Sequence, residues 1–245
     1  MSAFAKRIIT RKTVFDTRGI VARRPDATIV AFAGTDPAVW ENLATDLNIR
    51  PTAAGNVHAG FEAATEAVWD LVRAEMKVRS RPLLIAGHSL GGALAVLAAE
   101  RACDAEVAPI AVYCFGMPRV GGEAFASRYN AKCGTATYRL VHGRDLVATV
   151  PMSGLGFSHV GRVLWCGSGG VFDPKAALSA LGSDEPRFAA GLLNGVKNGL
   201  PALLAGEWFS PVGPGPIGPL FKYLPRPIRD HLPDQYCRAL EPAGV

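Results

Sequence analysis

Short apolar runs bounded by glycine and proline alternate with amphipathic stretches over much of the chain. Such runs have the length expected of strands that are buried on both faces of a sheet. The alternating residues 13–23 are followed by Arg24-Pro25-Asp26 and a second run, which indicates a β-hairpin. Buried strands are expected at residues 27–33, 83–86, 109–116, 136–141 and 160–166.

Helical periodicity separates these strands. Strands and helices in alternation predict an α/β fold with a mostly parallel central sheet and helices on both faces. On such a sheet, chemistry is expected where the strands end. We predict one domain over residues 1–245, in which the helical and Pro/Gly-rich residues 167–228 form a cap or insertion. Helices are expected at residues 36–46, 62–77, 93–99, 121–130, 174–181 and 185–204.

One turn in this pattern carries recognisable chemistry. Residues 87–91, Gly-His-Ser-Leu-Gly, lie between a predicted buried strand and a helix of small residues. This is the setting of a nucleophile elbow, in which a serine is presented at the apex of a strained turn. Gly87 and Gly91 would leave room for that turn, and the backbone N–H of Leu90 would point toward a developing oxyanion. Ser89 is therefore the candidate nucleophile.

Composition narrows the class of protein without naming an activity. The 245 residues are 49% hydrophobic and carry a formal charge of +5, from 26 basic and 21 acidic residues. The basic residues are mostly scattered, which does not favour nucleic-acid binding but is compatible with transient contact with a lipid interface. The five cysteines have no metal-ligand spacing and are expected to be free thiols.

The sequence also bears on where the protein is located. No apolar run is long enough to span a membrane, and the first ten residues lack a signal-peptide core. We therefore expect no transmembrane segment, and either a cytoplasmic protein or one exported without a recognisable N-terminal signal. We expect no metal and no organic cofactor.

A serine nucleophile needs a histidine base and a carboxylate that orients it. In α/β-hydrolases the chain order is serine, acid, histidine. Asp145 follows a predicted strand downstream of Ser89 and fits the acid. His159 and His231 both follow Asp145, and His231 is preferred because His159 begins the last strand, at the edge opposite Ser89 if that strand is parallel.

With these residues assigned, the chain resembles the class 3 (fungal-type) triacylglycerol lipases of the α/β-hydrolase superfamily. The matching segments occur in the family's order and cover roughly residues 13–166 and the region of His231. One departure is Ala33, where the family usually has arginine. The matching positions are residues 32–35, Trp40, 45–47, 57–61, 87–92, 116–121, 144–147, Pro151, 156–159 and 230–232.

The resemblance implies further roles. It supports His231 as the base, and it implies that Thr35 completes the oxyanion hole together with the N–H of Leu90. The helix at residues 36–46, otherwise an ordinary amphipathic surface helix, corresponds to the family's lid. The apolar face of that helix would consist of Val39, Trp40 and Leu43.

The resulting hypothesis is a serine-dependent carboxylester hydrolase that cleaves acylglycerols or other fatty-acyl esters through an acyl-enzyme on Ser89. A phospholipase or a short-chain esterase is the alternative within the hydrolases. A catalytically inactive lipid-binding module is the alternative from another class. The expected partner in each case is a lipid or a small ester.

Overall fold

A computed structural model of the chain describes eight ranges of residues. Statements about structure below concern these ranges alone, which are 5–11, 17–34, 57–76, 81–151, 153–173, 175–176, 179–184 and 229–241.

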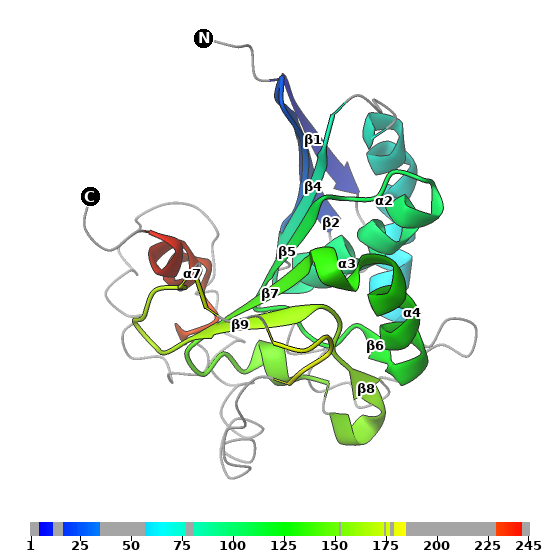
Figure 1. Cartoon of the computed structure of the whole chain (residues 1–245). Helices are drawn as coiled ribbons and strands as arrows, with labels where there is room; N and C mark the ends of the chain where they lie inside the picture. Colours follow the sequence, from blue (N-terminus) through cyan, green and yellow to red (C-terminus); the bar gives the residue numbers. More distant parts are fainter. Residues whose placement is uncertain are drawn as a thin grey trace.

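The centre of the structure is a seven-stranded sheet in the order β1-β2-β3-β4-β5-β7-β9 (Figure 1). The first three strands pair antiparallel, and every pair from β3 to β9 is parallel. The mostly parallel sheet expected from the sequence is therefore confirmed. The strands are β1 Ala5–Arg11, β2 Thr17–Arg23, β3 Thr28–Phe32, β4 Leu83–His88, β5 Ala111–Phe115, β7 Thr137–His142 and β9 Arg162–Cys166. A separate two-stranded sheet pairs β6 Gly121–Gly122 with β8 Phe157–Ser158.

Helices lie on both sides of this sheet. In Figure 1, α2 (Ala59–Met76), α3 (Leu90–Asp104) and α4 (Glu123–Cys133) lie together on one side. The short helix α7 (Pro233–Leu240) lies on the other side, near β7 and β9. Three single 3-10 turns complete the described elements, η1 Gly134–Ala136, η2 Val147–Thr149 and η3 Ser153–Leu155.

The core lies between the sheet and the helices α2, α3 and α4. Every residue from Leu90 to Ala99 on α3 is buried, and most of them are glycine, alanine or valine. Small side chains let α3 approach the sheet closely, and the resulting close packing fixes the start of the helix, which directly follows the turn at Ser89. That turn is the predicted elbow, which is consequently fixed on both sides by buried structure.

Two expectations about secondary structure need correction. The strand β1 was not predicted, because three of its seven residues are lysine or arginine; it pairs with β2 at the edge of the sheet, where charged residues are common. The helix predicted at 174–181 is wrong at its described residues, which form turns, a bend or irregular chain. There the hydroxyl of Ser179 accepts a hydrogen bond from the N–H of Val163 at 2.8 Å, which ties the segment to β9 instead.

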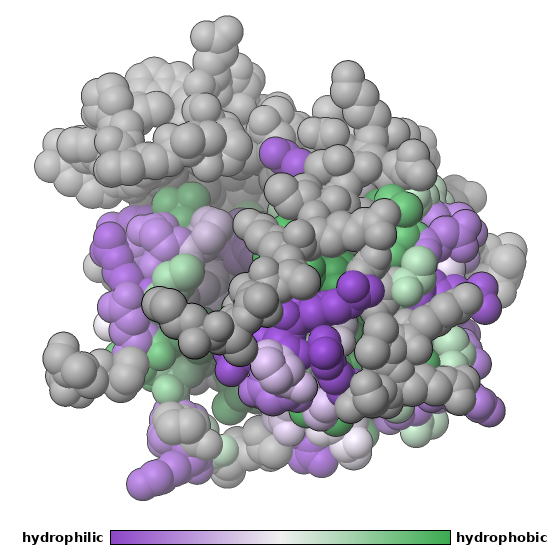
Figure 2. Space-filling view, turned by 90° about the horizontal axis from the view of Figure 1, so that it is seen from above, coloured by the Kyte–Doolittle hydropathy of each residue, from purple (hydrophilic) through white to green (hydrophobic). Residues whose placement is uncertain are grey.

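The predicted helices at 36–46 and 185–204 lie outside the described residues, and the division into one domain with an insertion at 167–228 stays a prediction. In the described ranges, no helix is long and apolar enough to cross a membrane. On the face shown in Figure 2, the coloured hydrophobic residues in view are interspersed with hydrophilic ones. All five cysteines are free thiols.

Candidate active site

Ser89 occupies a strained turn between β4 and α3. Its backbone has φ 59° and ψ −127°, in a region that residues other than glycine seldom adopt. The turn is tight, because a side chain at Gly87 would meet the backbone of Gly91, and one at Gly91 would meet the backbone of Phe32. The sequence therefore needs both glycines for the elbow, and the strain is held by the packed strand and helix on either side.

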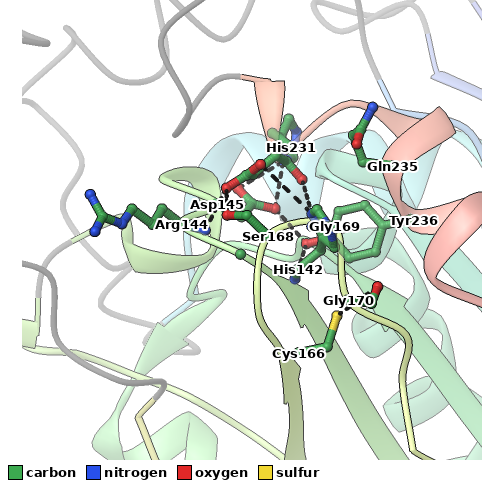
Figure 3. Close-up of polar contacts among 12 residues, drawn as sticks. His142, Arg144, Asp145, Cys166, Ser168, Gly169, Gly170, His231, Gln235 and Tyr236 are labelled. Atoms are coloured by element: carbon green, nitrogen blue, oxygen red, sulfur yellow. Dashed lines mark hydrogen bonds and ion pairs between the residues drawn. The ribbon is translucent and has the colours of Figure 1, made fainter.

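His231 links Ser89 to Asp145. Its Nε2 lies 2.9 Å from the Ser89 hydroxyl oxygen, and its Nδ1 lies 3.0 and 2.9 Å from the two carboxylate oxygens of Asp145. A carboxylate can only accept, so Nδ1 carries a proton and Nε2 is left to accept the proton of the serine hydroxyl. Figure 3 shows His231 and Asp145 together in one hydrogen-bonded cluster. The structure thus brings together the three side chains that were selected from the sequence.

Asp145 is completely buried at the end of β7. Its Oδ1 accepts the N–H of Val147 at 2.8 Å, and its Oδ2 accepts the hydroxyl of Tyr236 at 2.5 Å. Burial acts to raise the pKa of this carboxyl, but the charge of His231 and the hydrogen bonds from His231 and Tyr236 outweigh it and bring the pKa below its ordinary value. The residue is therefore held as a carboxylate that keeps its bond to His231.

Gly116, directly after β5, provides the space for this pair. Its φ is +56°, and a Cβ there would meet Oδ2 of Asp145, Nδ1 of His231 and the hydroxyl of Tyr236. Any residue with a side chain would displace the acid or the base. A glycine is thus required at this strand end both for its conformation and for its small size.

His88 forms a hydrogen bond with the backbone of the base. Its Nε2 lies 2.8 Å from the backbone carbonyl oxygen of His231, which can only accept, so the His88 ring donates. The centres of the two imidazole rings are 4.7 Å apart. Burial, together with the charge of His231, lowers the pKa of His88 from 6.5 to about 3. His88 consequently stays neutral and holds the chain at His231 in place.

The remaining predicted residues are placed as follows. Leu90 is the first residue of α3 and is buried. Thr35, Val39, Trp40 and Leu43 lie outside the described residues.

His159 is buried before the start of β9, and β9 runs parallel to β7, so this histidine lies toward the edge opposite Asp145. Within the described ranges, no cluster of three His, Cys, Asp or Glu side chains is suited to hold a metal ion.

Sequence reasoning missed the roles of His88, Gly116 and Tyr236. A signal for Tyr236 is present, since it lies five residues after His231, where one turn of a following helix can bring it back to the acid that His231 contacts. For Gly116 the signals are its place after a buried strand and its position in a segment that matches the lipase family, neither of which indicates its role. His88 lies in the matching elbow segment, but nothing there indicates its role, because its partner is a backbone carbonyl 143 positions away.

The sequence profile of the family Lipase (class 3) matches residues 29–154, more than half of the chain. A lipase from Rhizopus niveus is 33% identical over 66% of this chain and 45% of its own length. The secreted mono- and diacylglycerol lipase 1 of Fusarium solani is 32% identical over 60% of this chain and 43% of its own.

A solved structure of lipase II from Rhizopus niveus superposes with a TM-score of 0.59 at 28% identity, and the match covers 71% of this chain and 72% of that one. The matched region spans less than half of the length of the curated relatives. The strand order, the elbow at Ser89 and the family profile match all indicate the same family. The chain belongs to the class 3 lipase family of the α/β-hydrolase superfamily.

Proposed function

We propose that this protein hydrolyses the ester bonds of acylglycerols through an acyl-enzyme on Ser89. The observation that carries the proposal is the continuous hydrogen-bonded chain from the Ser89 hydroxyl through both ring nitrogens of His231 to the buried Asp145. This arrangement activates a serine hydroxyl for attack on a carbonyl carbon. Membership of the class 3 lipases supports an ester as the substrate.

The chemistry proceeds in two halves. Nε2 of His231 removes the proton of Ser89 as the oxygen attacks the ester carbonyl, and the resulting imidazolium is stabilised by Asp145. The same imidazolium then protonates the leaving alcohol. In the second half His231 takes a proton from water, which attacks the acyl-enzyme; His231 then returns that proton to the Ser89 oxygen as the acyl–oxygen bond breaks and the fatty acid leaves.

The oxyanion of each tetrahedral intermediate requires hydrogen-bond donors. The N–H of Leu90 at the start of α3 is one, and we assign Thr35 as the other by its place after β3. Loss of one such donor costs about 3 kcal/mol of transition-state stabilisation. We also propose that Val39, Trp40 and Leu43 face the acyl chain from a lid.

The substrate class rests on the relatives. Those described above are named as lipases or as mono- and diacylglycerol lipases, which supports acylglycerols over phospholipids. One of them is named as secreted, which favours export of this protein and lends no support to a cytoplasmic location. Hydrolysis rates on tributyrin, triolein, monoolein and phosphatidylcholine separate a lipase from a short-chain esterase and from a phospholipase.

Substitution of the nucleophile tests the proposal. Ser89→Ala should lower kcat for p-nitrophenyl butyrate by at least about 1,000-fold, because the covalent route is lost. Ser153→Ala, at an exposed serine in η3, is the matched control and should retain full activity. Equal activity of Ser89→Ala and the unaltered protein would overturn the proposal.

A further inference from the structure

A second buried carboxylate lies next to the base. Asp230 directly precedes His231 and is 1% exposed. Its Oδ2 accepts two hydrogen bonds, one from the backbone N–H of Arg144 at 2.8 Å and one from the hydroxyl of Ser168 at 2.5 Å. The steps of the proposed reaction do not use this group, so its burial needs another explanation.

The bond from Arg144 has a particular position in the chain. Arg144 directly precedes Asp145, and Asp230 directly precedes His231. A single hydrogen bond therefore joins the residue before the acid to the residue before the base. In Figure 3 the guanidinium of Arg144 points away from this cluster, so the contact is made by the main chain.

The cluster joins three segments at the carboxyl ends of the strands (Figure 3). The N–H of Gly143, after β7, donates to the carbonyl of Cys166 at the end of β9 at 2.7 Å. The N–H of Gly169 donates to Nε2 of His142 at 3.1 Å. The ring of His142 then donates through Nδ1 to the backbone carbonyl of Asp230 at 3.3 Å. The loops after β7 and β9 and the segment before α7 thus form one hydrogen-bonded unit.

These contacts do not make a second catalytic triad. The hydroxyl of Ser168 donates to the carboxylate of Asp230 itself, so no imidazole stands between the serine and the acid. Nδ1 of His142 lies 3.9 Å from this carboxylate, and Nε2 of the same ring already accepts the N–H of Gly169. Ser168 therefore has no base, and the cluster has a positioning role.

We propose that Asp230, held by Ser168, is a positioning residue that sets the distance between Asp145 and His231. This inference rests on the proposed function, in which these two side chains act as acid and base. A buried carboxylate left without donors is strongly disfavoured, so Asp230 keeps both of its bonds and keeps the two chain segments together. Asp230 holds the backbone next to the acid, through the N–H of Arg144. Tyr236, in contrast, bonds the side chain of Asp145.

Kinetics of matched variants form the first test. Asp230→Ala removes both acceptor bonds, and a displacement of the base by an ångström lowers kcat about 100-fold. Asp230→Asn keeps one carbonyl oxygen as an acceptor for Arg144 and should recover most of that loss. In Ser168→Ala, at an exposed residue, kcat should fall by roughly 3- to 10-fold, because one hydrogen bond to Asp230 is lost. KM should change less than kcat in all three.

The control is Asp234→Asn, which alters an exposed aspartate four residues along the chain. It should leave kcat and KM unchanged. Rates are expressed per active site titrated with a fluorophosphonate, so that unfolded protein does not count. An Asp230→Ala variant with unchanged kcat per titrated site would overturn the inference, because a residue with a merely structural role changes the folded fraction alone.

A spectroscopic readout separates this inference from the proposed function. The proton on Nδ1 of His231, shared with Asp145, should give a far-downfield proton NMR signal, which His231→Gln identifies by its loss. We expect the signal to be lost or broadened in Asp230→Ala and retained in Asp234→Asn. If the unaltered protein hydrolyses no ester but shows this pattern, the proposed function fails and the positioning role stands. If the signal is unchanged in folded Asp230→Ala, the positioning role fails.

Discussion

The hydroxyl of Tyr236 donates to Oδ2 of Asp145 at 2.5 Å, and the same hydroxyl accepts the backbone N–H of His142 at 3.2 Å. Tyr236 thereby joins α7 to the end of β7 at the buried acid. Burial, followed by the charge of Asp145, raises the pKa of Tyr236 well above its ordinary value. The phenol therefore keeps its proton, and donates it to Asp145, at every pH at which the protein is folded.

Tyr236→Phe should weaken both stability and catalysis. A hydrogen bond to a charged, buried group is lost, so the free energy of unfolding should fall by about 1.5–3 kcal/mol. We expect kcat to fall by about 10-fold, since Asp145 keeps its bonds to His231 and Val147. Urea unfolding and ester hydrolysis measure the two effects. Tyr113→Phe, at a tyrosine that is 39% exposed, is the control and should change stability by less than about 0.5 kcal/mol.

Asp145→Asn tests the tautomer of the base. An asparagine can present its amide N–H to Nδ1 of His231, and this would place the imidazole proton on Nε2, where it cannot accept from Ser89. We expect kcat to fall by about 10,000-fold, as a wrong tautomer predicts. Steady-state hydrolysis of p-nitrophenyl butyrate measures this. A loss below tenfold would show that Asp145 does not orient the base.

His88 should make the stability of the protein dependent on pH. Its pKa is about 3 in the folded protein and near 6.5 in the unfolded chain. Between these values the unfolded state binds a proton that the folded state does not, so the free energy of unfolding falls as the pH drops from 6.5 toward 3. The decrease from this group approaches about 1.4 kcal/mol per pH unit.

The variant His88→Gln removes this titration and retains a donor for the carbonyl of His231. Urea unfolding at several pH values should show a shallower decline for the variant than for the unaltered protein over the same range. Parallel curves would contradict a buried, neutral His88.

Gly116→Ala should damage the site directly. The new methyl group would meet Asp145, His231 and the hydroxyl of Tyr236, and the backbone is left-handed there. We expect kcat to fall by at least about 100-fold, because both acid and base must move. Gly156→Ala is the control, since Gly156 has φ +84° and no atom within 4 Å of its added Cβ. It should lose about 1–2 kcal/mol of stability to strain and leave kcat unchanged.

The sequence pattern was sufficient for the parallel half of the sheet. The run 83–86 is apolar and short, as expected of a strand that is covered on both faces, and the structure has β4 there. Residues 136–141 are less apolar, since they include Arg139, but most of β7 is buried as well. The edge strand β1 was not predicted because three of its seven residues are basic, and its pairing with β2 leaves no periodic signal in the sequence. Residues 174–181 have helical composition, but Ser179, which the structure describes, is bonded to Arg162 and Val163 of β9 and is not helical. Periodicity carries no information about such long-range contacts.

Within the candidate site, the order of Ser89, Asp145 and His231 could be predicted because the elbow motif and the strand ends fix it. The supporting residues could not. His88 and Asp230 act through backbone groups of segments far away in the chain, and a main-chain N–H or carbonyl has no signature in the sequence. Gly116 is needed for an empty space, which only the packed side chains around it define.

The central claim is that Ser89 is an activated nucleophile. A fluorophosphonate probe reacts with such a serine and forms a stable covalent adduct, which tandem mass spectrometry locates in the digested protein. We predict one adduct per chain, on Ser89, with parallel loss of ester hydrolysis and no adduct in Ser89→Ala. A folded protein that acquires no adduct at Ser89 would contradict the account and identify the chain as an inactive lipid-binding relative of the lipases.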